Sequence, residues 1–100
     1  PSGYRLSDLP SSEDIYESSF SSLWDIEDGQ YVMTSGIVMA ECQRGFILAM
    51  GYKNGDCVLV YDYEGQYNTS IGSLADVYIQ KITYRNLPEL IVDSATWIYY

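Results

Sequence analysis

Twelve residues, from Tyr31 to Cys42, constrain the fold of this chain more than any other segment. Their sequence, YVMTSGIVMAEC, is rich in β-branched and apolar residues, which is typical of a β-strand. The segment is too long for one flat strand, and apolar side chains fall on both of its faces. A strongly bent strand that serves both halves of a small β-barrel accounts for both features, and we expect a bend or bulge at Gly36.

Further β-strands are predicted along the rest of the chain, with turns between them. The Asn54-Gly55 pair is the strongest hairpin signal, because these residues tolerate the positive φ angles of a two-residue turn. A polar connection over residues 64–72 precedes a long alternating strand in which Lys81 shares a face with two β-branched residues. Residues 85–89 are expected to form a turn. The predicted strands after the first are residues 45–50, 57–63, 74–84 and 90–93, and a closing segment covers residues 96–100.

Five strands, a curved first strand and a break between the third and fourth describe an all-β, five-stranded OB-fold-like barrel. The positions that carry a closer resemblance are Asp28–Val32, Gly36–Val38, Gly45–Ala49, Val58–Tyr61, Ile71–Gly72, Val77–Tyr78 and Tyr84–Ile91. Over about residues 20–93 the chain resembles small OB-like domains in secreted and lipid-anchored proteins of Bacteroides-type bacteria. The resemblance implies the fold and an exported protein, and it implies no particular activity.

The N-terminal stretch is acidic and rich in serine. Residues 1–19 are predicted to form an acidic Ser-rich linker or helix, and residues 20–100 the OB-like barrel domain. Ser12 is placed to cap a short helix or turn with one apolar face. We expect Leu23 and Trp24 at the end of that face to plug one end of the barrel, and the alternative is a helix that binds a partner.

Charge and histidine content exclude several classes of function. Five basic residues against 14 acidic ones give a formal net charge of −9, and about two-thirds of it falls in residues 1–28. This balance disfavours non-specific binding to nucleic acid or to an anionic membrane, so we expect nucleic acid to be an unlikely partner. The chain has no histidine, which excludes Ser-His-Asp triads, imidazole bases and His-containing zinc sites.

Aromatic and cationic residues gather where an OB-fold binds its ligands. That surface is the face of the second and third strands together with the loops between strands one and two and strands four and five. Rings next to cations suit stacking on sugar rings or on bases, although tyrosines in a small β-barrel also serve cross-strand packing. The candidate ligand-binding residues are Arg44, Arg85, Tyr61, Tyr63, Lys53 and Tyr84.

Catalytic, metal and disulfide chemistry have little support in the sequence. Cys42 and Cys57 are expected on the order of 20 Å apart at about 3.3 Å per residue, so we predict two free thiols. The acidic run over residues 25–29 lacks the spacing of an EF-hand loop. Nothing places a carboxylate pair such as Glu41 and Glu89 across a cleft. We therefore expect no enzyme activity, no metal and no cofactor.

These inferences lead to one function and one alternative. We expect a non-catalytic binding or interaction module of an exported bacterial protein, located at the cell surface or outside the cell. Its partner is expected to be a protein or another domain of a larger chain. The alternative is an OB domain that recognises an oligosaccharide or single-stranded nucleic acid through the candidate residues. No run of 18 apolar residues is present, so no membrane span is expected.

Overall fold

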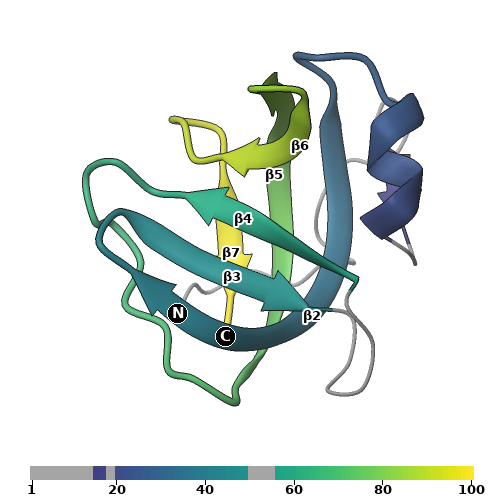
Figure 1. The fold of residues 1–100 in the computed structure, drawn as a ribbon. Helices are drawn as coiled ribbons and strands as arrows, with labels where there is room; N and C mark the ends of the chain where they lie inside the picture. The colour runs from purple at the N-terminus through teal and green to yellow at the C-terminus, as the bar shows by residue number, and fades with distance from the viewer. Residues whose placement is uncertain (1–14, 18–19, 50–55) are drawn as a thin grey trace.

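The structure, a computed structural model, describes residues 15–17, 20–49 and 56–100. These residues form seven β-strands and one short 3₁₀ helix (Figure 1). The elements are β1 (Ile15–Glu17), η2 (Phe20–Asp25), β2 (Tyr31–Cys42), β3 (Gly45–Ala49), β4 (Cys57–Tyr61), β5 (Leu74–Tyr84), β6 (Leu87–Ile91) and β7 (Trp97–Tyr99).

Five of the strands close into a barrel. β2 pairs antiparallel with β3 through its C-terminal half and with β5 through its N-terminal half. β3 pairs antiparallel with β4, β4 pairs parallel with β6, and β6 returns antiparallel to β5. The two short strands extend the sheet, β1 beside β2 and β7 beside β5. The predicted all-β, five-stranded barrel is therefore confirmed, with the bent strand β2 shared by both halves (Figure 1).

The sequence predicts a bend or bulge at Gly36, but the bulge in β2 lies further along the strand. The pairing with β3 changes register between Val38 and Ala40, two residues further along the strand. Gly36 is needed for another reason, because a Cβ there would lie 2.6 Å from the Ala49 carbonyl oxygen and 2.7 Å from the Leu48 side chain. The glycine therefore allows β3 to cross β2 closely, and the bulge absorbs the change in direction.

The N-terminal segment differs from the expected helix. Residues 15–17 form β1 in parallel with the start of β2, and the only helical turn in the described segment is η2. An open edge of β2 supplies hydrogen bonds that a serine-rich helix of weak propensity does not match. Leu23 closes the barrel end as predicted, whereas Trp24 is 58% exposed and does not. Ser12 lies outside the described residues, and the boundary between residues 19 and 20 stays a prediction.

The turn between β5 and β6 is shorter than predicted. Only Arg85 and Asn86 lie between the strands, with φ angles of 52° and 67°. Positive φ at both central residues is the geometry of a two-residue hairpin whose twist matches the flanking strands. Tyr84 and Leu87 therefore face each other directly, and the strand includes Pro88. The expected turn over residues 85–89 was therefore too long by three residues, which belong to β6.

The core follows the alternation expected from the sequence. Inward residues of the barrel strands pack with the apolar side chains of η2 and the residue after it. Both cysteines are free and exposed, which confirms the prediction of two thiols. Within the described residues, no helix is long and apolar enough to cross a membrane. The core cluster is Phe20, Leu23, Ile26, Val32, Val38, Phe46, Leu48, Val58, Val60, Ala75, Val77, Ile79, Leu90 and Ile98.

Candidate ligand-binding groove

Two adjoining cavities lie along β4 and β6, and together we call them the groove: the first is also bounded by η2, and the second lies on the outer face that these strands share with β5. One has a volume of about 400 Å³ and the other about 370 Å³, and they share Leu59 and Glu89. Strand alternation places every second residue of each strand on this outer face. The first cavity is lined by Phe20, Leu23, Trp24, Asp56, Cys57, Val58, Leu59, Leu87, Pro88 and Glu89. The second is lined by Leu59, Tyr61, Ile82, Tyr84, Glu89 and Ile91.

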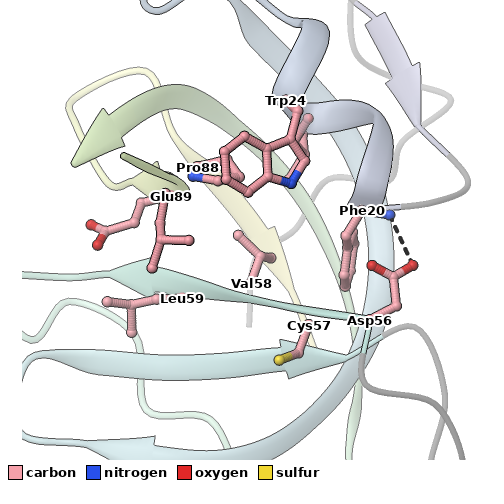
Figure 2. A pocket seen from close by; sticks show the side chains of 10 residues that line it. Phe20, Trp24, Asp56, Cys57, Val58, Leu59, Pro88 and Glu89 are labelled. Carbon is pink, nitrogen blue, oxygen red and sulfur yellow. Dashed lines mark hydrogen bonds between the residues drawn. The ribbon is translucent and has the colours of Figure 1, made fainter. Parts of the chain in front are cut away.

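Pro88 accounts for the opening between β4 and β6. The Val92 N–H donates to the Tyr61 carbonyl at 2.9 Å, and the parallel pairing continues back as far as Leu90 opposite Val60. In a parallel ladder every second residue donates to the same neighbour, so position 88 would supply the next bond. Proline has no N–H, and the ladder ends. Figure 2 shows the result, with Trp24 of η2 lying over the gap beside Pro88.

One end of the groove brings together three of the predicted residues. The Arg44 guanidinium lies 4.0 Å from the centroid of the Tyr63 ring, and the Tyr61 and Tyr63 rings are 6.2 Å apart at 56°.

Buried Asp62 holds this arrangement, because its N–H donates to the Arg44 carbonyl at 2.9 Å. The Asp62 carboxylate accepts hydrogen bonds from the Tyr67 N–H at 2.9 Å and from the Gln66 N–H at 3.1 Å.

The other end of the groove carries the second predicted cation. Arg85 lies 5.3 Å from the centroid of the Tyr84 ring, which is itself 52% exposed. Tyr84 pairs with Leu87 at the start of β6, whereas Tyr61 pairs with Ile91 at its end. The two arginines therefore mark opposite ends of the groove and do not converge on one point.

Of the chain's two lysines, the described residues include only Lys81, and it does not line the groove. Lys53 was a predicted site residue and lies outside the described residues. Lys81 is buried, and its Nζ donates to the Ile26 carbonyl at 2.6 Å, to Asp28 Oδ1 at 2.9 Å and to Thr83 Oγ1 at 3.0 Å. Its alternation with apolar residues was visible in the sequence, and its partners were not.

Glu89 is the main groove residue that the sequence analysis did not select. Burial raises the pKa of its carboxyl above the usual value. Within the described part of the chain, no hydrogen bond or ion pair involves this carboxylate. Figure 2 shows its side chain extending along β4 near Leu59 and away from Trp24. The signal that was available is a single acidic residue inside the apolar segment LPELI, at an outer-face position.

Comparisons with known proteins identify the fold. No protein-family model matches the sequence, and no curated protein is similar to it. Among solved structures, the Ifi202 HINa domain in complex with 20bp dsDNA covers 92% of this chain with a TM-score of 0.65 and 13% identity. The telomere capping protein Ten1 from Saccharomyces pombe covers 82% with a TM-score of 0.55 and 14% identity. A chain of the S. pombe Stn1-ten1 complex gives a TM-score of 0.56 at 15% identity over 86% of this chain.

The chain has an OB fold. It spans 52% of the HINa chain and 78% of each Ten1 structure's matched chain. The finer resemblance to Bacteroides-type secreted or lipid-anchored proteins is not shown by these matches.

The expectation that nucleic acid is an unlikely partner was wrong. A domain of the same fold has been solved on double-stranded DNA, so this class of partner is not excluded by the fold. About two-thirds of the net charge on which that expectation rested falls in residues 1–28. Net charge describes the whole chain, whereas a binding face depends on the residues along it.

Proposed function

We propose that this chain is a binding module that holds single-stranded nucleic acid in the groove, with bases stacked on its tyrosine rings. The observation that carries the proposal is the row of rings along one open face, with an arginine over the ring at each end. Tyr63 and Tyr84 are 63% and 52% exposed, so their faces are available to a base. Stacking on aromatic side chains contributes about 1–3 kcal/mol per base in single-strand-binding proteins.

A single strand fits the groove better than a duplex does. Bases in a duplex are already stacked on one another, and exposed tyrosine rings gain little from them. Duplex binding without base contacts depends instead on many phosphate contacts. Arg44 and Arg85 are the only cations that the described residues place at the groove. The HINa complex with DNA supports nucleic acid as a partner class for this fold.

The small number of cations gives the proposal a distinctive salt dependence. Two phosphate contacts to a single strand predict a slope of log K against log salt of about −1.4. A protein that binds mainly through charge shows a much steeper slope. Binding by this chain is therefore expected to persist as salt rises, because stacking supplies most of the free energy.

The test is a fluorescence anisotropy titration with labelled oligo-dT, an oligo-dT duplexed with oligo-dA, and a range of salt concentrations. Tyr63→Leu and Tyr84→Leu are each expected to weaken binding of the single strand by roughly tenfold, because leucine is apolar but cannot stack. Tyr63 lies beside Tyr61, which lines the second cavity. Tyr99→Leu is the matched control, since Tyr99 is 40% exposed on β7, which pairs with residues 76–78 of β5 and not with the part of β5 that lines the groove. Equal losses in all three variants, or no binding by the wild type, would reject the proposal.

Two further parts of the function remain proposals. We infer that the module is non-catalytic, which rests on the absence of histidine from the sequence. We infer that it belongs to an exported bacterial protein, which rests on the sequence resemblance alone. An assay for cleavage of the bound oligonucleotide tests the first, and localisation of the full-length protein tests the second.

A further inference from the structure

Glu89 occupies the middle of the groove. It lies opposite Ile82 on β5, and the parallel register places it level with Leu59 on β4. Tyr61 is two residues further along β4, and Tyr84 is two residues further along β5 in the opposite direction. Strand geometry separates each ring from the level of Glu89 by about 7 Å. A base stacked on either tyrosine therefore brings its edge toward the Glu89 carboxylate.

The surroundings of Glu89 call for hydrogen-bond donors from a ligand. An ionised carboxylate is an acceptor only, and it is costly to shield from water without donors. The second cavity places the apolar side chains of Leu59, Ile82 and Ile91 around it, together with the rings of Tyr61 and Tyr84. The described residues make no hydrogen bond to the carboxylate, and burial raises its pKa above the usual value. A ligand that supplies two N–H groups side by side relieves that cost.

Among the bases, guanine alone offers two adjacent N–H donors on its Watson–Crick edge. Its N1–H and N2 amino group are spaced to meet the two oxygens of one carboxylate. Adenine and cytosine each place a ring-nitrogen acceptor beside their amino group, and thymine flanks its N–H with two carbonyls. An acceptor that faces a carboxylate is repelled by it. A single-stranded base has this edge free for such contacts.

We propose that Glu89 is the base-reading residue of the groove and that it selects guanine. The inference rests on the proposed binding of single-stranded nucleic acid and adds a sequence preference to it. The base stacks on Tyr61 or on Tyr84, the apolar floor limits its contact with water, and the carboxylate accepts from both donors. The arginines at the two ends of the groove favour a phosphate chain over a cationic peptide, which is the other ligand that an unpaired carboxylate attracts.

The test compares oligonucleotides of about a dozen nucleotides, a length within the reach of one OB domain. Each is oligo-dT with a single central nucleotide that is thymine, guanine or inosine. A bidentate contact of this kind discriminates by roughly tenfold, so the guanine oligonucleotide is expected to bind about ten times more tightly than oligo-dT. Inosine lacks the N2 amino group and is expected to lose most of that preference.

Glu89→Gln is the deciding variant. The amide has one acceptor and one donor, so the ratio of the guanine and thymine affinities is expected to fall close to one. Its circular dichroism spectrum and its urea unfolding curve are expected to match those of the wild type, which shows that the variant folds. Glu27→Gln is the control, because Glu27 is exposed in the connection before β2 and lines neither cavity.

The outcomes separate this inference from the proposed function. Equal wild-type affinity for all three oligonucleotides overturns guanine selection and leaves single-strand binding standing. A guanine preference that survives in Glu89→Gln overturns the role of Glu89. No binding to any of them, or binding only to a lysine- and arginine-rich peptide, overturns both.

Discussion

The phenol of Tyr31 donates a hydrogen bond to the carboxylate of Asp93 and so ties the start of β2 to the segment between β6 and β7. Tyr31 also stacks on Tyr78 of β5 at a centroid distance of 5.2 Å. The two contacts join three parts of the chain that lie far apart in sequence. They lie outside the groove and serve the stability of the barrel.

The Tyr31 contact predicts a loss of stability at high pH. The hydrogen bond to Asp93 is the largest cause that raises the pKa of Tyr31 to about 12, from 10.0. Because the folded state holds this proton more tightly than the unfolded state, stability is complete below about pH 10 and falls as pH rises toward 12. Tyr31→Phe is expected to cost about 1 kcal/mol at neutral pH and to flatten this decline. Urea unfolding at a series of pH values checks it; an unchanged decline in the variant contradicts the assignment.

The buried Lys81 predicts a large mutational effect. Its Nζ bonds the Ile26 carbonyl, Asp28 and Thr83, and so holds the connection between η2 and β2 against the barrel. Lys81→Met keeps the apolar stem and leaves the Ile26 carbonyl without this donor. We expect a loss of about 1–3 kcal/mol in the free energy of unfolding, measured by urea denaturation at neutral pH. A neutral substitution would show that the stem alone stabilises this position.

Asp28, the partner of Lys81, predicts a loss of stability in acid. The hydrogen bonds from Lys81 and then Thr83 hold the pKa of the Asp28 carboxyl below its usual value. Its stabilising contribution is present above the unfolded pKa of about 4 and is lost as pH falls through the lower folded pKa. Asp28→Asn is expected to make unfolding less dependent on pH in this acidic range. Thermal unfolding of both proteins between neutral and acidic pH checks this, and parallel curves contradict it.

Gly45 predicts that one methyl group disrupts the barrel. Its φ angle is 137°, and a Cβ there would lie 1.9 Å from the Val60 carbonyl oxygen. Gly45→Ala is therefore expected to lower stability by more than about 3 kcal/mol, because the β3–β4 pair must separate. Gly65→Ala is the control, with a φ angle of 65° and no atom within 4 Å of the added Cβ. It is expected to cost about 1 kcal/mol, from backbone strain alone. Similar losses in both variants would rule out the clash as the cause.

Pro88 predicts that a restored N–H closes part of the groove. Pro88→Ala supplies the donor that the parallel ladder lacks, and β4 is expected to pair with β6 beyond Leu90. The new amide is expected to be protected from hydrogen exchange, and binding of oligo-dT is expected to weaken. The new hydrogen bond stabilises the folded state, whereas loss of the proline gives the unfolded chain more conformational freedom and so destabilises the fold. Because the two effects oppose each other, the free energy of unfolding is expected to change by less than about 1 kcal/mol. A rapidly exchanging amide at position 88 contradicts the explanation of the gap.

Local sequence patterns predicted most of the β-strands of this chain. The alternation that places Lys81 among inward residues and the long segment around Gly36 both follow from the two-residue period of a strand. The length of a turn is harder to predict, because the turn expected over residues 85–89 includes Leu87, Pro88 and Glu89, which lie within β6. The helix expected from Ser12 was also displaced, since pairing with an open strand edge depends on a distant partner.

The groove was only partly visible in the sequence. Arg44, Tyr61 and Tyr63 were selected because they flank one turn and one strand end, and the structure brings them together. Glu89 and Trp24 were not selected, because their place depends on the register between β4 and β6 and on the position of η2. That register joins segments separated by some thirty residues, and no local pattern encodes it.

The sequence by itself determined that the chain forms a small β-barrel, that its ends and turns carry the few cations, and that imidazole chemistry is absent. These properties follow from side-chain period, turn residues and composition, which act locally or over the whole chain. The tertiary structure decided which groups Lys81 bonds, that Pro88 opens a gap and that Glu89 stands between two tyrosine rings. Each of these depends on which strands meet and in what register, and in a closed barrel that is settled only when all five strands pack together.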